Sequence, residues 1–303
     1  MPIELTIKRV IKELLEKYNA KPKKYLGQYF VLSKNALSKM VAAAEIKKTD
    51  TILEIGPGLG TLTRELAKTG AKIIVVEKDS LMVRILSETL FDLKNVKVVR
   101  ADARHLSPDL WIYETYKSGD KSVKIVANLP YNIATFLIRQ WLESENLSAL
   151  PTGQAGGRQV RPKMMVLMIQ KEVARRICAA PPRANLLAMS VQFYAEPKII
   201  GYVPKEMFWP KPKVGAAIIK IVPRKGKMAF FKRSREKQQF FKIMKAGFSQ
   251  PRKQLAGNLT KKLNVPKENI LKVFRNLDIS EKIRAENLSF DQWQSLALLL
   301  IHN

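Results

Sequence analysis

A glycine-rich turn preceded by an acidic residue is the first feature of this sequence that could support chemistry. The turn is Glu54-Ile-Gly-Pro-Gly-Leu-Gly60, and it continues the apolar run 51–55. Dinucleotide sites need the spacing G-x-G-x-x-G/A, whereas the third glycine here comes one position early, and no Lys-Ser/Thr pair of a phosphate-binding loop follows. The pattern therefore favours a ligand without a pyrophosphate. S-adenosylmethionine fits, with its ammonium group near Glu54 and its other atoms passing close to Gly56 and Gly58.

Two further acidic residues follow the next two apolar runs. Glu77 ends the run 72–77, and Asp102 comes shortly after the run 96–99. A carboxylate at the tip of the second strand can accept both hydroxyls of a ribose, and one at the third strand can accept from an adenine amino group. Each alone could be a solvated turn residue. Three signals at three consecutive strand ends favour an S-adenosylmethionine site.

The tetrad Asn128-Leu129-Pro130-Tyr131 follows the fourth apolar run and belongs to the same sheet edge. The N6 amino group of adenine is a poor nucleophile because its lone pair is delocalised into the ring. An Asn side-chain oxygen and a backbone carbonyl held rigid by Pro130 could each accept one N6–H and turn that lone pair toward a methyl donor. Tyr131 offers a face for stacking an extruded base, worth about 1–3 kcal/mol. The same residues could form an ordinary turn, but their position favours catalysis.

Alternating strands and helices must position these residues. Apolar runs separated by helical patterns predict a parallel sheet covered on both faces, which is typical of α/β proteins. We expect an α/β fold with a Rossmann-like S-adenosylmethionine-dependent methyltransferase sheet over residues 25–225, preceded by a helical extension over 1–24. Residues 151–162 are rich in Gly and basic residues and contain no acidic residue, a composition that predicts an exposed loop. The purely helical periodicity that follows predicts a smaller all-helical domain over 226–303, and the many basic residues of this domain favour a role in RNA binding.

The charge of the chain indicates its partner class. The 303 residues include 54 Lys and Arg but only 26 Asp and Glu, a net charge of +28, which favours nucleic acid as a partner. Positive charge is densest in the last hundred residues. No apolar run is long enough to span a membrane, and no secretory signal pattern is present, so we expect a cytoplasmic protein. One cysteine and two distant histidines argue against an internal disulfide and against a metal site.

Taken together, these stretches resemble the ribosomal RNA adenine dimethyltransferase family, of the type that acts on small-subunit rRNA. The similarity runs from about residue 24 to about residue 300. It rests on seven segments: LGQYF (26–30), EIGPG (54–58), NLPYNIAT (128–135), QKEV (170–173), FWPKPKV (208–214), PRKQL (251–255) and RAENL (284–288).

The resemblance implies methylation of two adjacent adenosines near the 3′ end of small-subunit rRNA, giving N6,N6-dimethyladenosines. The partner would be this rRNA within an immature ribosomal subunit, and the enzyme would act as a monomer. Phe208 would hold the target base opposite Tyr131. The family usually has Asn or His where Tyr29 stands, and Leu where Val31 stands. The residues expected to bind the cofactor are Gln28, Tyr29, Val31, Glu54, Gly56, Gly58, Glu77, Asp102 and Asn128.

Two alternative functions are compatible with these features. One is methylation of adenine in large-subunit rRNA, as in the related enzymes of macrolide resistance. Segment 284–288 and Leu129 favour the small-subunit type. The other is a ribosome-assembly factor that binds RNA without turnover, against which the intact Asn128 and Tyr131 argue.

Overall fold

The computed structural model describes residues 3–105, 123–143, 162–224 and 234–302, which form two compact units. The first unit comprises Met1–Ala174 and Lys198–Pro223, and the second comprises Arg175–Pro197 and Arg224–Asn303. The second unit thus includes a segment that lies well before the expected C-terminal domain. The predicted boundary between residues 225 and 226 and most of the predicted loop 151–162 lie outside the described residues.

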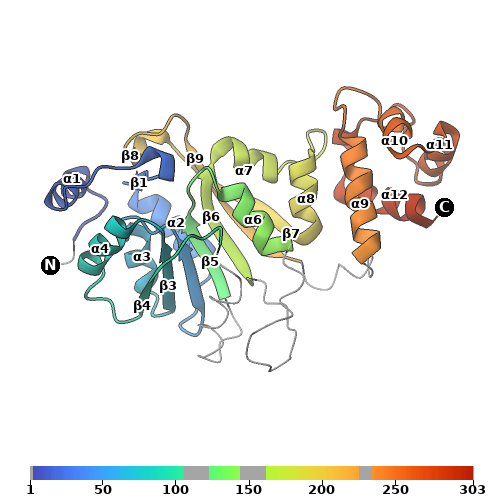
Figure 1. The fold of residues 1–303 in the computed structure, drawn as a ribbon. Helices are drawn as coiled ribbons and strands as arrows, with labels where there is room; N and C mark the ends of the chain where they lie inside the picture. The colour runs from blue at the N-terminus through green and yellow to red at the C-terminus, as the bar shows by residue number, and fades with distance from the viewer. Residues whose placement is uncertain (1–2, 106–122, 144–161, 225–233, 303) are drawn as a thin grey trace. The chain divides into compact units, whose positions relative to one another are not determined.

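A seven-stranded sheet forms the core of the first unit (Figure 1). Strands β2 to β6 pair in parallel, whereas β9 runs antiparallel to β6. The strands that alternate with helices are therefore parallel, as the sequence predicts, and β9 is added antiparallel to them. The chain enters β9 beside the point where β6 ends, with Gln170 opposite Ala216, so it can only run back along β6. The spatial order is β4 (Val96–Arg100), β3 (Lys72–Glu77), β2 (Thr51–Ile55), β5 (Val123–Asn128), β6 (Met164–Gln170), β9 (Ala216–Pro223) and β7 (Ala195–Val203).

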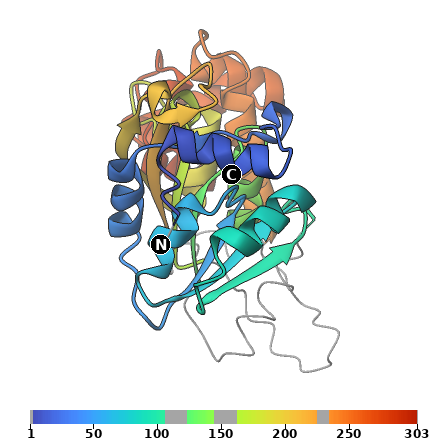
Figure 2. The ribbon, with the colours of Figure 1, turned by 90° about the vertical axis from the view of Figure 1, so that its left-hand side faces the viewer.

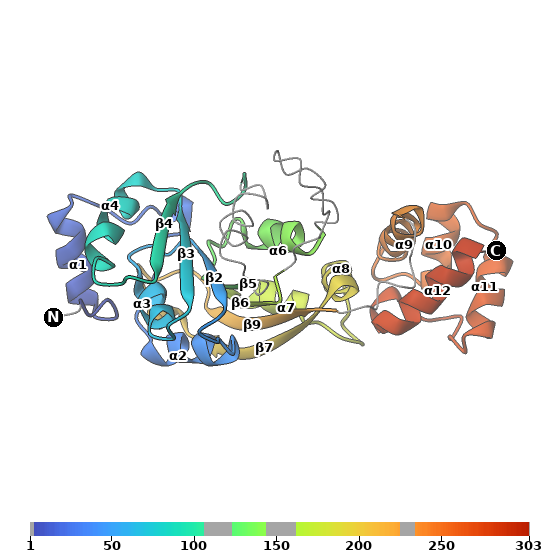
Figure 3. The same cartoon turned by 90° about the horizontal axis from the view of Figure 1, so that it is seen from below.

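Helices cover the sheet on both sides, as the alternating pattern predicts. Helices α2 (Lys34–Ala43) and α3 (Thr61–Ala67) bury apolar side chains against one face, where they join a core cluster with strand residues. Figure 3 shows α6 (Ala134–Glu143) on the opposite side of the sheet from α2. Helix α4 (Ser80–Thr89) follows β3, and α7 (Lys171–Ile177) follows β6. The central strands β2, β3, β5 and β6 are consequently shielded from water, as their continuous apolar runs require, whereas β4 and β7 are partly exposed.

The N-terminal segment packs beside the elements that carry the glycine turn and Glu77. Helix α1 (Lys8–Lys17) lies next to α4 in Figure 2, and the Tyr18 hydroxyl donates to Glu88 at 2.6 Å. A 3-10 turn, η1 (Lys24–Leu26), leads to the short strand β1 (Phe30–Val31). Strand β1 pairs antiparallel with β8 (Phe208–Trp209), which follows the 3-10 turn η2 (Lys205–Met207). This two-stranded pairing attaches the N-terminal segment to the far end of the first unit's sequence.

The second unit is helical throughout its described part beyond residue 234. Aromatic rings fill its core, with Phe193 and Phe240 centred 5.0 Å apart and Trp293 fully buried. The backbone of Gly247 lies against Trp293 so closely that a Cβ there would come within 2.3 Å of the indole. The elements are α8 (Leu186–Tyr194), α9 (Ser234–Gly247), α10 (Leu255–Leu263), α11 (Lys267–Asn276), the 3-10 turn η4 (Ala285–Asn287) and α12 (Phe290–His302).

Candidate active site

A cavity of about 340 Å³ opens at the carboxyl ends of β2, β3, β4 and β5. Parallel strands bring these ends to one edge of the sheet, which is why residues far apart in the sequence meet there. Residues 25–31 form the other side of the cavity. All of the residues predicted to bind the cofactor line it: Gln28, Tyr29, Val31, Glu54, Gly56, Gly58, Glu77, Asp102 and Asn128.

The glycine turn takes a backbone conformation that side chains disfavour. Gly56 and Gly58 have φ angles of 65° and 59°, in the left-handed region. A Cβ on Gly58 would come within 3.3 Å of the Phe30 ring, which packs over the turn from β1. The turn therefore brings bare backbone to the cavity wall, where a ligand can approach it closely.

Glu54 differs from the sequence-based expectation in its protonation. It is almost completely buried, and Thr63 of α3 donates its hydroxyl to the carboxyl group at 2.7 Å. Burial raises the pKa of Glu54 to about 8, outweighing the opposite effect of the Thr63 hydrogen bond. The predicted carboxylate is thus mainly a neutral acid at pH 7, because none of the described cationic side chains forms an ion pair with it.

Glu77 is held by backbone groups at the end of β3. Its carboxylate is 8% exposed and accepts the N–H of Asp79 at 2.8 Å. Burial raises the pKa of Glu77, while hydrogen bonds from backbone N–H groups act in the opposite direction. Asp79 in turn accepts from the Gln28 amide at 3.0 Å and pairs with Lys23 at 2.9 Å. Gln28 therefore ties the N-terminal segment to the edge of the cavity beside Glu77.

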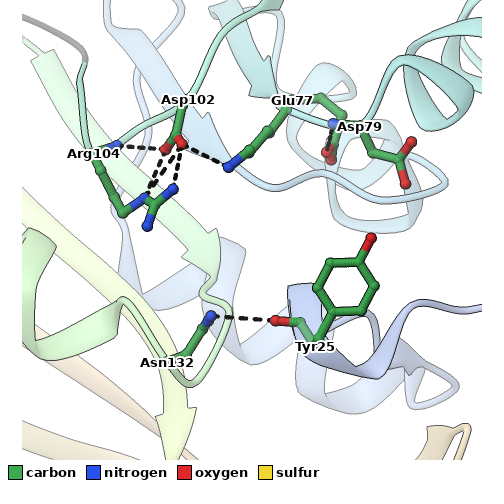
Figure 4. A network of polar contacts seen from close by, with 7 residues as sticks. Tyr25, Glu77, Asp79, Asp102, Arg104 and Asn132 are labelled. Atoms are coloured by element: carbon green, nitrogen blue, oxygen red, sulfur yellow. Dashed lines mark hydrogen bonds and ion pairs between the residues drawn. The ribbon is translucent and has the colours of Figure 1, made fainter.

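Asp102 lies between two cations at the cavity rim (Figure 4). Arg104 approaches its carboxylate to 2.7 Å and Lys78 to 2.8 Å. Hydrogen bonding from Arg104, followed by Lys78, holds the pKa of Asp102 well below its usual range. These donors occupy both carboxylate oxygens, so acceptance from an adenine amino group requires one of them to turn away. Both cations are about half exposed, which makes such an exchange inexpensive.

Two residues of the tetrad, Asn128 and Pro130, line the cavity. Asn128 donates from its side-chain Nδ2 to the Tyr29 carbonyl at 3.3 Å, which leaves its Oδ1 as an acceptor. Leu129 is buried, and its N–H donates to the Met168 carbonyl of β6 at 3.0 Å. Pro130 packs so closely on Gly27 that a Cβ on that glycine would come within 2.9 Å of it. The Asn side chain and the proline are therefore rigidly held.

Tyr131 stacks on Tyr29 rather than standing open. The two ring centroids are 5.8 Å apart with an interplanar angle of 26°. The Tyr131 hydroxyl is buried and has no hydrogen-bond partner among the described residues. Burial, with a smaller contribution from Tyr29, raises the pKa of Tyr131 to about 12. One face of the predicted base-stacking ring is thus already covered.

Phe208, which the resemblance implies holds the target base, is buried in this structure. Its side chain is 3% exposed and belongs to the core cluster that includes Val31 and Leu37. The pairing of β8 with β1 buries it, and it is absent from the described residues that line the cavity. The role of Phe208 as a second aromatic residue at the target base stays a prediction.

Comparison with known proteins places the chain in a family. Residues 19–302 match the family model described as ribosomal RNA adenine dimethylase. The chain belongs to this family. It is 38% identical to ribosomal RNA small subunit methyltransferase A of Dehalococcoides mccartyi strain CBDB1, over 95% of this chain and 91% of that protein. It is 35% identical to the protein of the same name from Clostridioides difficile strain 630, over 95% of this chain and 94% of that protein.

Solved structures resemble the dimethylase chain in fold as well. A dimethyladenosine transferase from Plasmodium falciparum is 26% identical with a TM-score of 0.67, covering 88% of this chain and 95% of that chain. The 23S rRNA methyltransferase ErmE gives a TM-score of 0.70 at 20% identity, over 90% of this chain and 99% of that chain. The second likeness shows the shared fold alone. The chain is thus a Rossmann-like methyltransferase, and such proteins use S-adenosylmethionine.

The second unit of this family member contains a basic cleft of about 550 Å³. Asn258 of α10, which lines the cleft, donates to the carbonyls of Gly247 and Gln250, and the Leu255 N–H donates to the Ile283 carbonyl. Six cations and no acidic residue are found among the described residues that line the cleft. These cations are Arg252, Lys253, Lys261, Lys262, Lys282 and Arg284.

Several residues of the candidate site were not predicted from the sequence. Thr63 could have been found as a polar residue on the otherwise apolar face of α3. Lys78 and Arg104 stand one and two positions from predicted acids, and only the structure shows that they cover Asp102. Asn132 donates to the Tyr25 carbonyl at 3.3 Å, a link that no local pattern reveals (Figure 4).

The structure gives no indication of a metal site or a membrane segment in its described part. No group of three or more His, Cys, Asp or Glu side chains gathers there in a way that could hold a metal ion. None of the described helices is long and apolar enough to cross a membrane.

Proposed function

We propose that this chain transfers methyl groups from S-adenosylmethionine to two adjacent adenosines near the 3′ end of small-subunit rRNA, giving N6,N6-dimethyladenosines. The relatives named ribosomal RNA small subunit methyltransferase A support this substrate over large-subunit rRNA. The enzyme would act as a cytoplasmic monomer on an immature ribosomal subunit.

The cavity suits S-adenosylmethionine in its shape and its chemistry. The bare backbone at Gly56 and Gly58 would admit the ligand closely, and the buried carboxylate of Glu77 would accept the ribose hydroxyls. Glu54 would face the ammonium group, and Asp102 would face the adenine after Arg104 moves. Bound there, S-adenosylmethionine supplies an electrophilic methyl group on its sulfonium. Val31 and Gln28 would close the cavity from the N-terminal side.

The observation that carries the proposal is the orientation of Asn128 at the cavity wall. Its Nδ2 donates to the Tyr29 carbonyl, so its Oδ1 is the atom left to accept an N6–H of the target adenine. The carbonyl of Leu129 precedes Pro130 and would accept the second N6–H, since the Pro130 carbonyl already accepts from Ile133 at 3.2 Å. Fixed acceptors of this kind lower the barrier without any reorganisation during the reaction.

The basic cleft would bind the rRNA backbone. Its cations project from a helical unit whose charge is poorly balanced by acids, as suits a polyanion. This assignment uses the second unit for positioning the RNA and leaves the chemistry to the first unit.

The test is methylation of small subunits purified from cells that lack their own dimethylase. Incubation with labelled S-adenosylmethionine should give N6,N6-dimethyladenosine by mass spectrometry of the digested rRNA, and primer extension should stop at two adjacent adenosines near the 3′ end. Asn128→Ala should lose at least a hundredfold in rate and keep its RNA affinity. Asn35→Ala, at an exposed position of α2, is the matched control and should methylate normally. A stop confined to large-subunit rRNA would overturn the proposal, as would binding without any methylation.

A further inference from the structure

Tyr29 contacts the tetrad with both its main chain and its side chain. Its carbonyl accepts the Asn128 amide at 3.3 Å, and its ring stacks on Tyr131 at 5.8 Å. Two residues earlier, Gly27 packs against Pro130. The segment before β1 thus holds three of the four tetrad residues, although about a hundred residues of sequence separate it from them.

The two contacts determine the orientations of the Asn128 amide and of the Tyr131 ring, which the tetrad alone does not determine. A side-chain amide can present either its oxygen or its nitrogen, and donation to the Tyr29 carbonyl selects the orientation that leaves Asn128 Oδ1 available. The Tyr131 hydroxyl has no partner among the described residues, so the packing of its ring determines its orientation. The ring that packs on it face to face is that of Tyr29.

Two other aromatic side chains near the cavity pack elsewhere. Phe208 is buried in the core cluster, and Phe30 stacks on Trp209 at 6.3 Å. Unlike these two rings, the ring of Tyr29 is both at the cavity wall and stacked on Tyr131.

We propose that Tyr29 is a positioning residue for the methyl-transfer reaction: it backs one face of Tyr131 so that the other face receives the target adenine, while its carbonyl orients Asn128. This inference rests on the proposed function, because it assigns a role within that reaction. It also changes the role predicted for Tyr29, from a side-chain contact with the cofactor to a support for the ring that binds the base.

Side-chain variants separate the two contacts, because the carbonyl of residue 29 remains in all of them. Tyr29→Phe keeps the ring and should methylate within twofold of the unmodified chain. Tyr29→Leu and Tyr29→Met fill similar space without a ring, and each should lower kcat about tenfold, equivalent to ~1.4 kcal/mol. Affinity for S-adenosylhomocysteine, measured by calorimetry, should change less than twofold in all three. Phe91→Leu, an exposed aromatic position outside the cavity, is the matched control.

The outcomes distinguish this inference from the function on which it rests. If the unmodified chain forms no dimethyladenosine, the proposed function fails. If it does, and Tyr29→Leu and Tyr29→Met then keep full kcat, Tyr29 is not a positioning residue. If Tyr29→Phe loses activity and binds S-adenosylhomocysteine at least tenfold more weakly, the hydroxyl contacts the cofactor and the inference is overturned. Thermal unfolding of each variant shows whether it is folded. If either Tyr29→Leu or Tyr29→Met fails to fold, the other still tests the loss of the ring.

Discussion

The neutral state of Glu54 leads to a prediction about cofactor affinity. If the ligand's ammonium group binds beside Glu54, the buried acid has to ionise first. With a pKa of about 8, ionisation costs about 1.4 kcal/mol at pH 7 and about twice that at pH 6. Affinity for S-adenosylhomocysteine, which carries the same ammonium group, should therefore rise about tenfold between pH 6 and pH 7. Calorimetry in buffers of different ionisation enthalpy should detect release of about 0.9 proton per ligand at pH 7.

The matched variant for this prediction is Glu54→Gln, which keeps the shape of the side chain and can still accept from Thr63. Its affinity should be nearly independent of pH over the same range and should lack the proton release. The ratio of the affinities of the unmodified chain and of Glu54→Gln is taken at each pH. Titration of the ligand or of Glu77 affects both proteins alike and therefore cancels in this ratio. Equal pH dependence in both proteins would refute the reasoning, because the proton would then come from another group.

Two further predictions concern the fold and the RNA surface. Lys124 is buried with Asp50 in an ion pair of 2.8 Å, so Lys124→Met should lower the free energy of unfolding by about 3–5 kcal/mol in urea titrations; a loss below about 1 kcal/mol would contradict this. Replacing three cleft lysines with Gln should reduce the slope of log affinity against log salt by about 2 in RNA-binding assays, and an unchanged slope would mean that these lysines face solvent. The three are Lys253, Lys261 and Lys262.

The elements of the first unit could be predicted from the sequence because their signals are local. The strand 72–77 was expected and found with the same limits, and β2 likewise matches the run 51–55. The direction of β9 could not be predicted, since an apolar run does not indicate whether the strand pairs parallel or antiparallel with its neighbour. The pairing of β1 with β8 was also missed, because two residues on each side give no periodicity to detect.

The members of the site were predictable, but their states were not. Acids at strand ends identify a cavity edge because the sheet's geometry brings them together. Whether Glu54 is charged depends on its burial and on Thr63, and whether Asp102 is accessible depends on Arg104. The expected position of Phe208 came from resemblance alone, and the packing around β8 determines where the ring lies.

The pairing of β1 with β8 also has a consequence for the order in which the chain acquires its cavity during synthesis. The glycine turn and its strands can form soon after β3 has been translated. The N-terminal wall, however, is secured by the bond from Leu32 N–H to the Met207 carbonyl and by the β1–β8 ladder. These partners leave the ribosome only when more than two-thirds of the chain has been made. A nascent chain halted before residue 209 would contain β2 to β6 but neither β9 nor a closed cofactor site, so we expect cofactor capture to be a late, long-range event in the folding of this protein.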